Sequence, residues 1–373
     1  MKEAKNPLAI LKVLILVGLT GLIGLIGLRP CLAGELIQIT DTAGRQVSVP
    51  KSPDRIICLG TGTLRLVVYL ESHKKIVGVE DFEKRFPTTR PYWIARGDEM
   101  AHLPSIGPGG PGAINKEPDL EKVLAVKPDV IFITYLDRGK AEALQKKIGI
   151  PVVVLTYGPF GTFDEKVYDS LRLCGAILDK QNRAEAVIRF IEKSRKDLLK
   201  RIEPIPEKMK PSVYIGGIGF RGTHGIESTE TEYLPFEWVR ANPVAKRDGR
   251  KGHRFLDKEK ILSWDPDIIF IDSGGNDLIR RDYEKKPSFY QGLKAFKNKK
   301  VYLLYAFNWY MTNIETVIVD AYAVGKMIYP ENFKDVKMGQ KADEIYSYLL
   351  GRPIHEKMER AYGKIGENPS YLR

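Results

Sequence analysis

The chain has 373 residues and a formal net charge of +12. About 340 residues follow a predicted N-terminal cut, which is ample for two domains with separate cores. The sequence holds 3 cysteines, and none lies in a Cys-x-x-Cys motif, which argues against thiol redox chemistry and a thiolate zinc site. Cys58 and Cys174 fall in a strand pattern and a helix pattern, so two buried free thiols are favoured over a disulfide.

Residues 1–33 are predicted to be a targeting segment. Three lysines precede an apolar run from Val13 to Leu28, and Cys31-Leu32-Ala33 has small residues where a signal peptidase cleaves. We place the cut after Ala33, with a retained membrane anchor or lipidation at Cys31 as alternatives. All three put the main body outside the cytoplasm. Cleavage lowers the net charge to about +9, which suits anionic ligands, an anionic membrane surface or a merely solvated surface better than nucleic acid.

The chain after residue 33 alternates between predicted strands and helices, which indicates parallel α/β sheets. A hairpin is expected at 38–49, followed by strands at 55–59, 75–79, 130–134, 152–155, 213–216, 268–272 and 301–304. Residues 83–118 are expected to form a long irregular segment, and long ordered loops tend to be functional. An amphipathic helix is predicted at 315–329.

Residues 179–202 form the strongest predicted helix. Charges fill one face, and apolar residues recur at helical spacing on the other: Ala184, Val187, Ile188, Ile191, Leu198, Leu199 and Ile202. Pro204 and Pro206 end the helix. At ~1.5 Å per residue it spans roughly 35 Å, long enough to bridge two lobes as a stiff strut.

A fifteen-residue unit occurs twice, at Asp119–Ile133 and at Asp257–Ile271. Each copy has an acidic helix start, an apolar helix face, a Pro-Asp turn and a buried strand. A unit repeated at long range predicts two lobes with similar folds. The repeat also places one carboxylate at the same point of each lobe, Glu121 and Glu259.

Together these patterns predict an α/β fold of two similar Rossmann-like lobes with mostly parallel sheets, joined by one long rigid helix. The expected boundaries are 1–33 for the targeting segment or anchor, 34–167 for the N-terminal lobe, 168–204 for the interlobe helix and 205–373 for the C-terminal lobe. Ligands of parallel sheets bind at the carboxyl ends of the strands, so a paired fold of this kind suggests a protein that holds something.

The order of several segments carries a family resemblance: Ile39–Arg45, Pro53–Ile57, the two repeats and the long helix. The chain resembles the periplasmic (class III) substrate-binding proteins of ABC importers for iron-siderophore, haem or cobalamin over nearly all of its length after residue 33. The resemblance implies a monomer with modest hinge motion and a shallow interlobe ligand site. It also implies that Glu121 and Glu259 dock onto arginines of a permease dimer. The alternative is that each is an acidic first-turn residue facing the helix dipole.

Four pairs of residues after predicted strands or in loops are expected to line the ligand site: Thr61 and Thr63, Trp93 and Arg96, Arg221 and His224, and Trp309 and Tyr310. The resemblance to binders of ferric catecholate siderophores implies that His224 and Tyr310 complete the coordination of the iron, since a ferric ion favours phenolate and accepts imidazole. The surroundings of His224 depart from that pattern, and the loop 273–276 lacks the expected arginine.

Simpler roles remain open for these residues. His224 fits a loop histidine bonded to the backbone, Trp309 and Tyr310 fit an aromatic lid or core, and Trp93 fits a core position. The two arginines, Arg96 and Arg221, also fit surface ion pairs.

We therefore expect an extracytoplasmic binding protein, at the periplasm or the outer face of the cytoplasmic membrane, that captures a chelated metal and delivers it to a permease. A ferric siderophore is the first expectation, and haem, cobalamin or a nickel chelate is the alternative. No cofactor besides the transported ligand and no nucleic-acid partner is expected. An enzyme or a sensor domain is remote, because no Gly-x-Ser-x-Gly, P-loop or His-Glu-x-x-His motif occurs. No three-histidine cluster with a carboxylate is visible, which disfavours a bare metal ion.

Overall fold

The computed structural model describes residues 35–159 and 163–372, so the predicted targeting segment lies outside the described residues. The backbone divides into a first unit, Met1–Leu36, and a second unit, Ile37–Arg373. All elements below lie in the second unit, apart from the first residue of β1. The predicted boundaries at 167 and 204, within the second unit, stay predictions.

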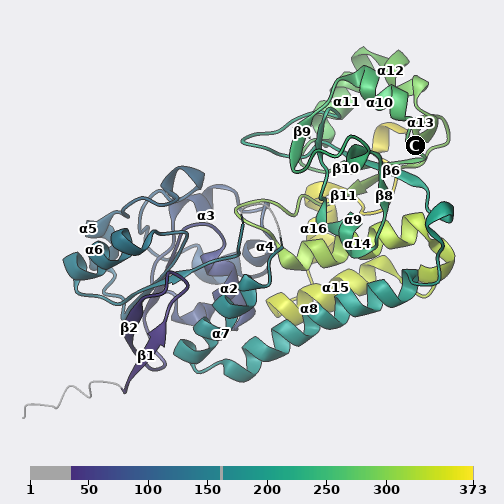
Figure 1. Ribbon diagram of the computed structural model, residues 1–373. Coiled ribbons are helices and arrows are strands. Elements are labelled where there is room, and N and C mark those ends of the chain that lie inside the picture. The colour runs from purple at the N-terminus through teal and green to yellow at the C-terminus, as the bar shows by residue number, and fades with distance from the viewer. Residues whose placement is uncertain (1–34, 160–162, 373) are drawn as a thin grey trace, which may run out of the picture. The chain divides into compact units, whose positions relative to one another are not determined.

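The first half of the chain holds a hairpin and a parallel sheet in the order β3-β4-β5 (Figure 1). Its strands are β1 (Leu36–Thr40), β2 (Gln46–Pro50), β3 (Ile56–Leu59), β4 (Val130–Thr134) and β5 (Val152–Leu155). Its helices are α2 (Thr63–Tyr69), α3 (Asp81–Arg85), α4 (Pro91–Met100), α5 (Leu120–Ala125), α6 (Arg138–Ile148) and α7 (Lys166–Leu178), with short turns η1 (His73–Lys75) and η2 (Pro111–Ala113).

The second half repeats the scheme with a parallel sheet in the order β11-β10-β6-β8 and adds an antiparallel pair, β7-β9. Its strands are β6 (Ser212–Gly216), β7 (Ser228–Glu230), β8 (Asn242–Pro243), β9 (His253–Phe255), β10 (Ile268–Asp272) and β11 (Val301–Leu304). Its helices are α9 (Leu234–Trp238), α10 (Lys258–Trp264), α11 (Asn276–Lys285), α12 (Pro287–Gly292), α13 (Lys294–Lys297), α14 (Ile314–Ile328), α15 (Met338–Leu350) and α16 (His355–Tyr362), with turns η3 (Glu207–Met209), η4 (Val244–Lys246), η5 (Pro330–Phe333) and η6 (Ser370–Leu372). The predicted α/β class with mostly parallel sheets is confirmed.

The repeated sequence unit forms the same structure twice, α5 with β4 and α10 with β10. Both strands are buried along their whole length, which explains their uninterrupted apolar sequences. The aspartate of each Pro-Asp turn binds the start of the neighbouring strand: Asp129 accepts from the Arg55 amide at 2.9 Å, and Asp267 accepts from the Ser212 amide at 2.7 Å. The repeat is therefore one folding unit in which the turn carboxylate fixes the strand beside it.

The long predicted helix is α8 (Gln181–Ile202). Its buried stripe contains six of the seven apolar residues expected there, and Leu199 is half-buried. The helix packs against α7 of the first half and against α9 and α14 of the second, so it contacts both halves of the chain. A second connection is made by α15, which packs on α2 and α4 as well as on α14.

Two predictions about the first half are wrong. Residues 75–79 form no strand, only isolated bridges at Ile76 and Val79. The segment bonds to Ile56 of β3 through Val77 and then to residues 104–106 through Val79, so neither pairing is long enough to form a strand. The segment 83–118 is not irregular throughout, since α4 begins at Pro91, whose fixed φ suits a first helical position.

The two cysteines expected to stay unpaired, Cys58 and Cys174, are buried free thiols. Burial is the leading cause that raises the pKa of both groups. The prediction of free structural thiols is confirmed.

The N-terminal hairpin is attached to the first sheet through a buried ion pair. Asp41 accepts two hydrogen bonds from Arg45, at 2.9 and 2.7 Å, and one from the Val154 amide of β5 at 3.1 Å. Arg45 also donates to the Val152 carbonyl. The hairpin therefore depends on a carboxylate that has no access to water.

We predict that Asp41→Ala lowers the free energy of unfolding by about 3–5 kcal/mol, because it leaves the Arg45 guanidinium buried without its partner. Urea titration measures the change. The matched control is Asp54→Ala, whose side chain is 92% exposed and pairs loosely with Lys75 at 3.7 Å. The control should change stability by less than about 0.5 kcal/mol. Equal effects of the two substitutions would contradict the assignment.

Candidate functional site

The loop after β6 carries two of the predicted ligand residues, Arg221 and His224. It leaves the carboxyl end of the strand at Gly217, which has a φ of +82°. A Cβ atom at Gly217 would lie 3.1 Å from the Asp272 carbonyl oxygen, so glycine is required for the close approach of the loop after β10. The loop then projects its side chains at the sheet edge where parallel α/β proteins bind ligands.

Five side chains meet in what we call the histidine–aromatic cluster: Phe220, Arg221, His224, His253 and Phe255. The rings of Phe220 and His253 are stacked, with centroids 4.2 Å apart and planes at 6°. Phe255 is an edge-on neighbour of both histidines, at 4.7 Å from His224 and 4.8 Å from His253. The Arg221 guanidinium lies over Phe220 at 5.5 Å. Both phenylalanines are exposed, which is unusual for large apolar rings that do not meet a ligand or partner.

The hydrogen bonds of the two imidazoles fix their tautomers. His224 Nε2 lies 2.8 Å from the Phe220 carbonyl oxygen, which can only accept, so this nitrogen carries the proton. Ser228 Oγ donates to the Ile218 carbonyl and must accept from His253 Nε2 at 2.8 Å. Neither Nδ1 atom has a hydrogen-bond partner among residues 35–159 and 163–372. Each histidine thus keeps an unused lone pair on Nδ1, the arrangement found when the other ring nitrogen orients a metal ligand.

The surroundings of His253 favour its neutral imidazole. Burial first, and then the nearby His224, lower the pKa of His253. No group of three or more histidine, cysteine or carboxylate ligands occurs in the part of the chain that the structure describes. Each of the two histidines can therefore offer one nitrogen to a metal ion whose other ligands come with it, and the cluster is not a complete cage for a bare ion.

The first-half residues Thr61 and Thr63 lie in the core at the end of β3. Thr63 Oγ1 donates to the Leu59 carbonyl oxygen at 2.6 Å, and the Thr61 carbonyl accepts from Thr134 Oγ1 at 2.9 Å. Both threonine side chains are buried. The Thr63 hydroxyl caps the end of β3, whereas the buried Thr61 hydroxyl has no hydrogen-bond partner among the described residues. Neither threonine lines a described cavity.

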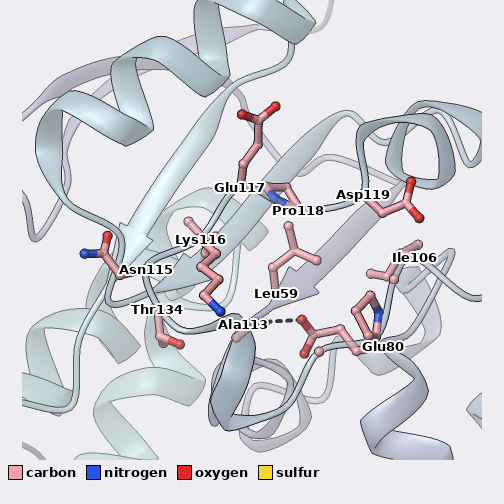
Figure 2. Close-up of a pocket in the computed structure, with 15 residues that line it drawn as sticks. Leu59, Glu80, Ile106, Ala113, Asn115, Lys116, Glu117, Pro118, Asp119 and Thr134 are labelled. Carbon is pink, nitrogen blue, oxygen red and sulfur yellow. Dashed lines mark hydrogen bonds between the residues drawn. The ribbon is translucent and has the colours of Figure 1, made fainter.

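A small cavity of about 60 Å³ lies at the carboxyl ends of β3 and β4, with a mainly apolar lining that includes Glu80, Lys116 and Thr134. Figure 2 shows Lys116 pointing into it toward the carboxylate of Glu80, with Thr134 at its edge. A volume of this size holds roughly two water molecules. The cavity is too small for a metal chelate.

A hollow of about 740 Å³ lies in the second half, between the loop after β10 and the C-terminal helix α16. Its lining includes Asp277, Glu356 and Glu359 together with Arg360. None of the predicted ligand residues lines it. Lys364 also lines it, so three carboxylates face two cations and the hollow has no excess of positive charge for an anionic ligand.

Tyr310 lies in the segment between β11 and α14 and reaches into the first half of the chain. Its hydroxyl donates to Glu80 Oε2 at 2.5 Å and accepts from the Gly110 amide at 3.1 Å. Its ring packs on Phe82 at 4.6 Å. Burial and then the charge of Glu80 raise the pKa of Tyr310, so the phenolate form is disfavoured. No contact in the described residues joins Tyr310 to His224.

The segment around Tyr310 is held by two side chains. Arg65 is fully buried and donates to the carbonyl oxygens of residues 309–312, at 2.8 to 3.4 Å. Asn313 Nδ2 donates to the Phe307 and Trp309 carbonyl oxygens at 2.8 and 3.1 Å. Tyr310 has a φ of 53°, which a non-glycine residue adopts only when its surroundings enforce it. Trp309 itself is half-buried and packs edge-on against Phe86.

The remaining pair of predicted ligand residues lies on α4. Trp93 is buried in the core. Arg96 donates to the Leu350 carbonyl at 2.9 Å and to Glu99 Oε1 at 2.8 Å, so it ties α4 to the end of α15. The structure thus brings Arg221 and His224 together but joins neither of them to Trp93 or Arg96.

The predicted docking residues Glu121 and Glu259 lie in the first turns of α5 and α10, and both are exposed. Neither carboxylate has an ion pair or a hydrogen bond within the described part of the chain. Matching positions in the two repeats therefore carry two unpaired surface charges.

Two members of the cluster, His253 and Phe255, were not expected from the sequence. They lie on β9, which is only three residues long and has no apolar alternation. The one available signal was a histidine two residues from a phenylalanine after a basic segment, 246–251.

A family model described as "Periplasmic binding protein" matches residues 56–306. The molybdate-binding protein MolA of Haemophilus influenzae is 24% identical over 327 residues, which are 83% of this chain and 89% of MolA. The structure of MolA bound to molybdate has a TM-score of 0.64 at 22% identity and covers 85% of this chain and 98% of that chain. A periplasmic solute binding protein from Veillonella parvula has a TM-score of 0.70 at 23% identity, covering 88% and 97%.

CeuE of Helicobacter pylori, solved with Ni(II) bound, has a TM-score of 0.60 at 16% identity and covers 87% of this chain and 99% of that chain. These structural likenesses concern the fold. Within the described residues, no helix combines the length and the apolar character that a bilayer crossing needs.

Stability should depend on pH through Glu80. Burial raises the pKa of Glu80 from the ordinary 4.5 to about 7, although hydrogen bonds from Tyr310 and Gly60 oppose the rise. Because the folded value exceeds the unfolded one, the contribution of Glu80 to stability is complete below about pH 4.5 and is lost as the pH rises through about 7.

We predict that Glu80→Gln removes this part of the pH dependence. Urea unfolding of the native protein and the variant between pH 4 and pH 8 measures it. The native protein should lose stability relative to the variant across the window from about pH 4.5 to about pH 7, and the difference should be constant above it. Parallel curves for the two proteins across that window would contradict the prediction.

Proposed function

We propose, from the premise that this chain belongs to the periplasmic binding protein family, that it captures a small metal chelate at the histidine–aromatic cluster. The chain is a substrate-binding protein of an ABC importer and works with a permease and an ATPase. The described site serves capture and delivery. We propose that the protein acts in the periplasm or at the outer face of the cytoplasmic membrane, as the predicted targeting segment suggests.

The observation that carries the proposal is the pair of unused imidazole lone pairs in one exposed aromatic cluster. His224 and His253 each donate from Nε2 to a fixed oxygen, which aims the ring and leaves Nδ1 to bind a metal. Two ligands leave room for a chelator to occupy the rest of the coordination sphere. Phe220 and Phe255 offer apolar faces to the organic part of that chelator, and Arg221 offers a positive charge to its carboxylates or catecholates.

The two imidazole ligands also favour some metal ions over others. Imidazole nitrogen suits borderline ions such as Ni(II), Cu(II) or Zn(II), whereas a ferric ion favours phenolate oxygen. Tyr310, the phenolate expected for iron, keeps its proton and bonds to Glu80. A nickel-type chelate is therefore our first proposal and a ferric siderophore follows it. The Ni(II) bound by the structurally similar CeuE supports this order.

A metal oxyanion is the second candidate, favoured by Arg221 in the cluster and by the basic segment 246–251 that leads into β9. A guanidinium suits a tetrahedral oxyanion by charge and by paired hydrogen bonds. MolA, which binds molybdate, is similar over most of both chains.

We propose further that Glu121 and Glu259 dock the protein onto the permease. Both are exposed, unpaired and placed at equivalent points of the two halves. A permease that is a two-fold dimer would meet them with one cationic site per subunit. Matched unpaired carboxylates support this role better than dipole stabilisation alone, because each helix is only 6 or 7 residues long.

We predict that metal-free protein binds one equivalent of Ni(II) citrate and that His224→Ala or His253→Ala weakens binding at least tenfold, as expected for the loss of one of two protein ligands. Isothermal titration calorimetry with nickel citrate, a ferric bis-catecholate and sodium molybdate ranks the three ligand classes. His102→Ala is the matched control, since His102 is exposed and lies outside the cluster. An affinity for nickel citrate that neither His224→Ala nor His253→Ala changes would contradict the assignment of the site.

A separate prediction concerns delivery. Glu121→Ala combined with Glu259→Ala should leave the affinity for the metal chelate unchanged and abolish uptake, because the two carboxylates lie exposed on α5 and α10 and neither belongs to the histidine–aromatic cluster. Uptake by proteoliposomes that contain the permease and ATPase measures it. Equal loss of binding and uptake would contradict a docking role.

A further inference from the structure

Exposed apolar side chains are few and are not scattered at random. In the described residues the large ones are Leu36, Leu124, Met209, Phe220, Phe255 and Leu262. Two of them belong to the histidine–aromatic cluster. Two others, Leu124 and Leu262, lie at the same position of the two repeats, three residues after the docking glutamates. The two repeats thus share an exposed leucine as well as a sequence, although neither helix needs an exposed leucine in order to fold.

Each leucine shares a helix face with a glutamate. Residues three apart on an α-helix are neighbours on its surface, so Glu121 lies beside Leu124 on α5 and Glu259 lies beside Leu262 on α10. Leu124 is 44% exposed and Leu262 is 37% exposed. The two helices bury Val123 and Ile261 instead, which anchor the opposite face in the core. A carboxylate next to an accessible apolar side chain is therefore present once in each half.

The lysine beside the first glutamate does not neutralise it. Lys122 pairs with Asp119, at 3.3 Å between Nζ and Oδ2. Asp119 also caps α5 by accepting from the Lys122 amide. The position four residues after Glu121 is alanine, so no cation lies at the helical neighbour.

The second glutamate is left unpaired in the same way. Lys258 pairs with Asp282, and Lys260 lies over the Trp264 ring at 5.3 Å. The position four residues after Glu259 is serine. Two different local arrangements thus produce the same result, an unneutralised carboxylate beside an exposed leucine.

We propose that Leu124 and Leu262 are the apolar anchors of the surface that docks onto the permease dimer. This inference rests on the proposed function. Each leucine would enter a shallow apolar depression next to the arginine that binds the neighbouring glutamate. The apolar contact excludes water from the ion pair, which strengthens an Arg–carboxylate interaction that would be weak at an open surface.

The repeat identifies the partner as a two-fold one. Two equivalent faces on one chain fit two equivalent sites on a symmetric dimer, whereas a symmetric pair of copies of this chain would need only one patch from each. An anionic lipid surface is disfavoured because both faces present a negative charge. Charge and symmetry therefore point to a cationic, two-fold protein.

The test measures the affinity of the chelate-loaded protein for the importer's permease–ATPase complex in nanodiscs. Leu124→Ser and Leu262→Ser should each weaken it about tenfold, which corresponds to about 1.4 kcal/mol. The affinity for nickel citrate should stay unchanged. Met209→Ser is the matched control, because Met209 is 68% exposed and lies in neither repeat, and it should leave the affinity within twofold of the native value.

The melting temperature of each leucine variant separates loss of docking from loss of folding. If the glutamate variants weaken docking while both leucine variants stay within twofold of the native protein, the anchors are disproved and the docking glutamates stand. If neither the glutamate nor the leucine variants change the affinity, the docking role in the proposed function fails as well. Equal losses for Met209→Ser and the leucine variants would also overturn the inference.

Discussion

One buried guanidinium, that of Arg65, joins the first half of the chain to the segment that carries Tyr310. Arg65 lies on α2, the first helix after β3. Its guanidinium donates to the backbone carbonyl oxygens of residues 309–312, which follow β11. Those carbonyls converge only because Tyr310 and Met311 adopt positive φ angles of 53° and 75°. The strain of these positive φ angles is offset by the hydrogen bonds to Arg65, which also satisfy a buried guanidinium. The Tyr310 hydroxyl is thereby bonded to Glu80, and our proposal assigns ligand binding to the histidine–aromatic cluster.

We infer function from polar atoms that have no hydrogen-bond partner within the described residues and from exposed apolar side chains. Many polar side chains cap strands or tie helices, as the half-buried Arg96 does at the end of α15. Two imidazole nitrogens and two phenylalanine rings remain available after β6 and on β9. One carboxylate and one leucine remain available on each of α5 and α10. Our proposal therefore assigns ligand capture to the histidine–aromatic cluster and permease docking to α5 and α10.

The sequence predicted the parts that obey local rules. Fully buried strands such as β4 and β10 have continuous apolar runs, and α8 has a clean stripe, so their positions were predicted within about two residues. Only part of the cluster was predicted. Arg221 and His224 follow a strand that is easy to recognise, whereas His253 lies on a three-residue strand without apolar alternation. The contact of Tyr310 with Glu80 could not be predicted, because it depends on the long-range bonds of Arg65.

X-ray absorption at the nickel K edge tests the central claim most directly. Citrate contains no imidazole, so any imidazole scattering from protein loaded with nickel citrate must come from the protein. We expect that scattering in the native protein, reduced in His224→Ala and absent when His253→Ala is added. A nickel spectrum without imidazole, or one unchanged by removing both histidines, would contradict the account.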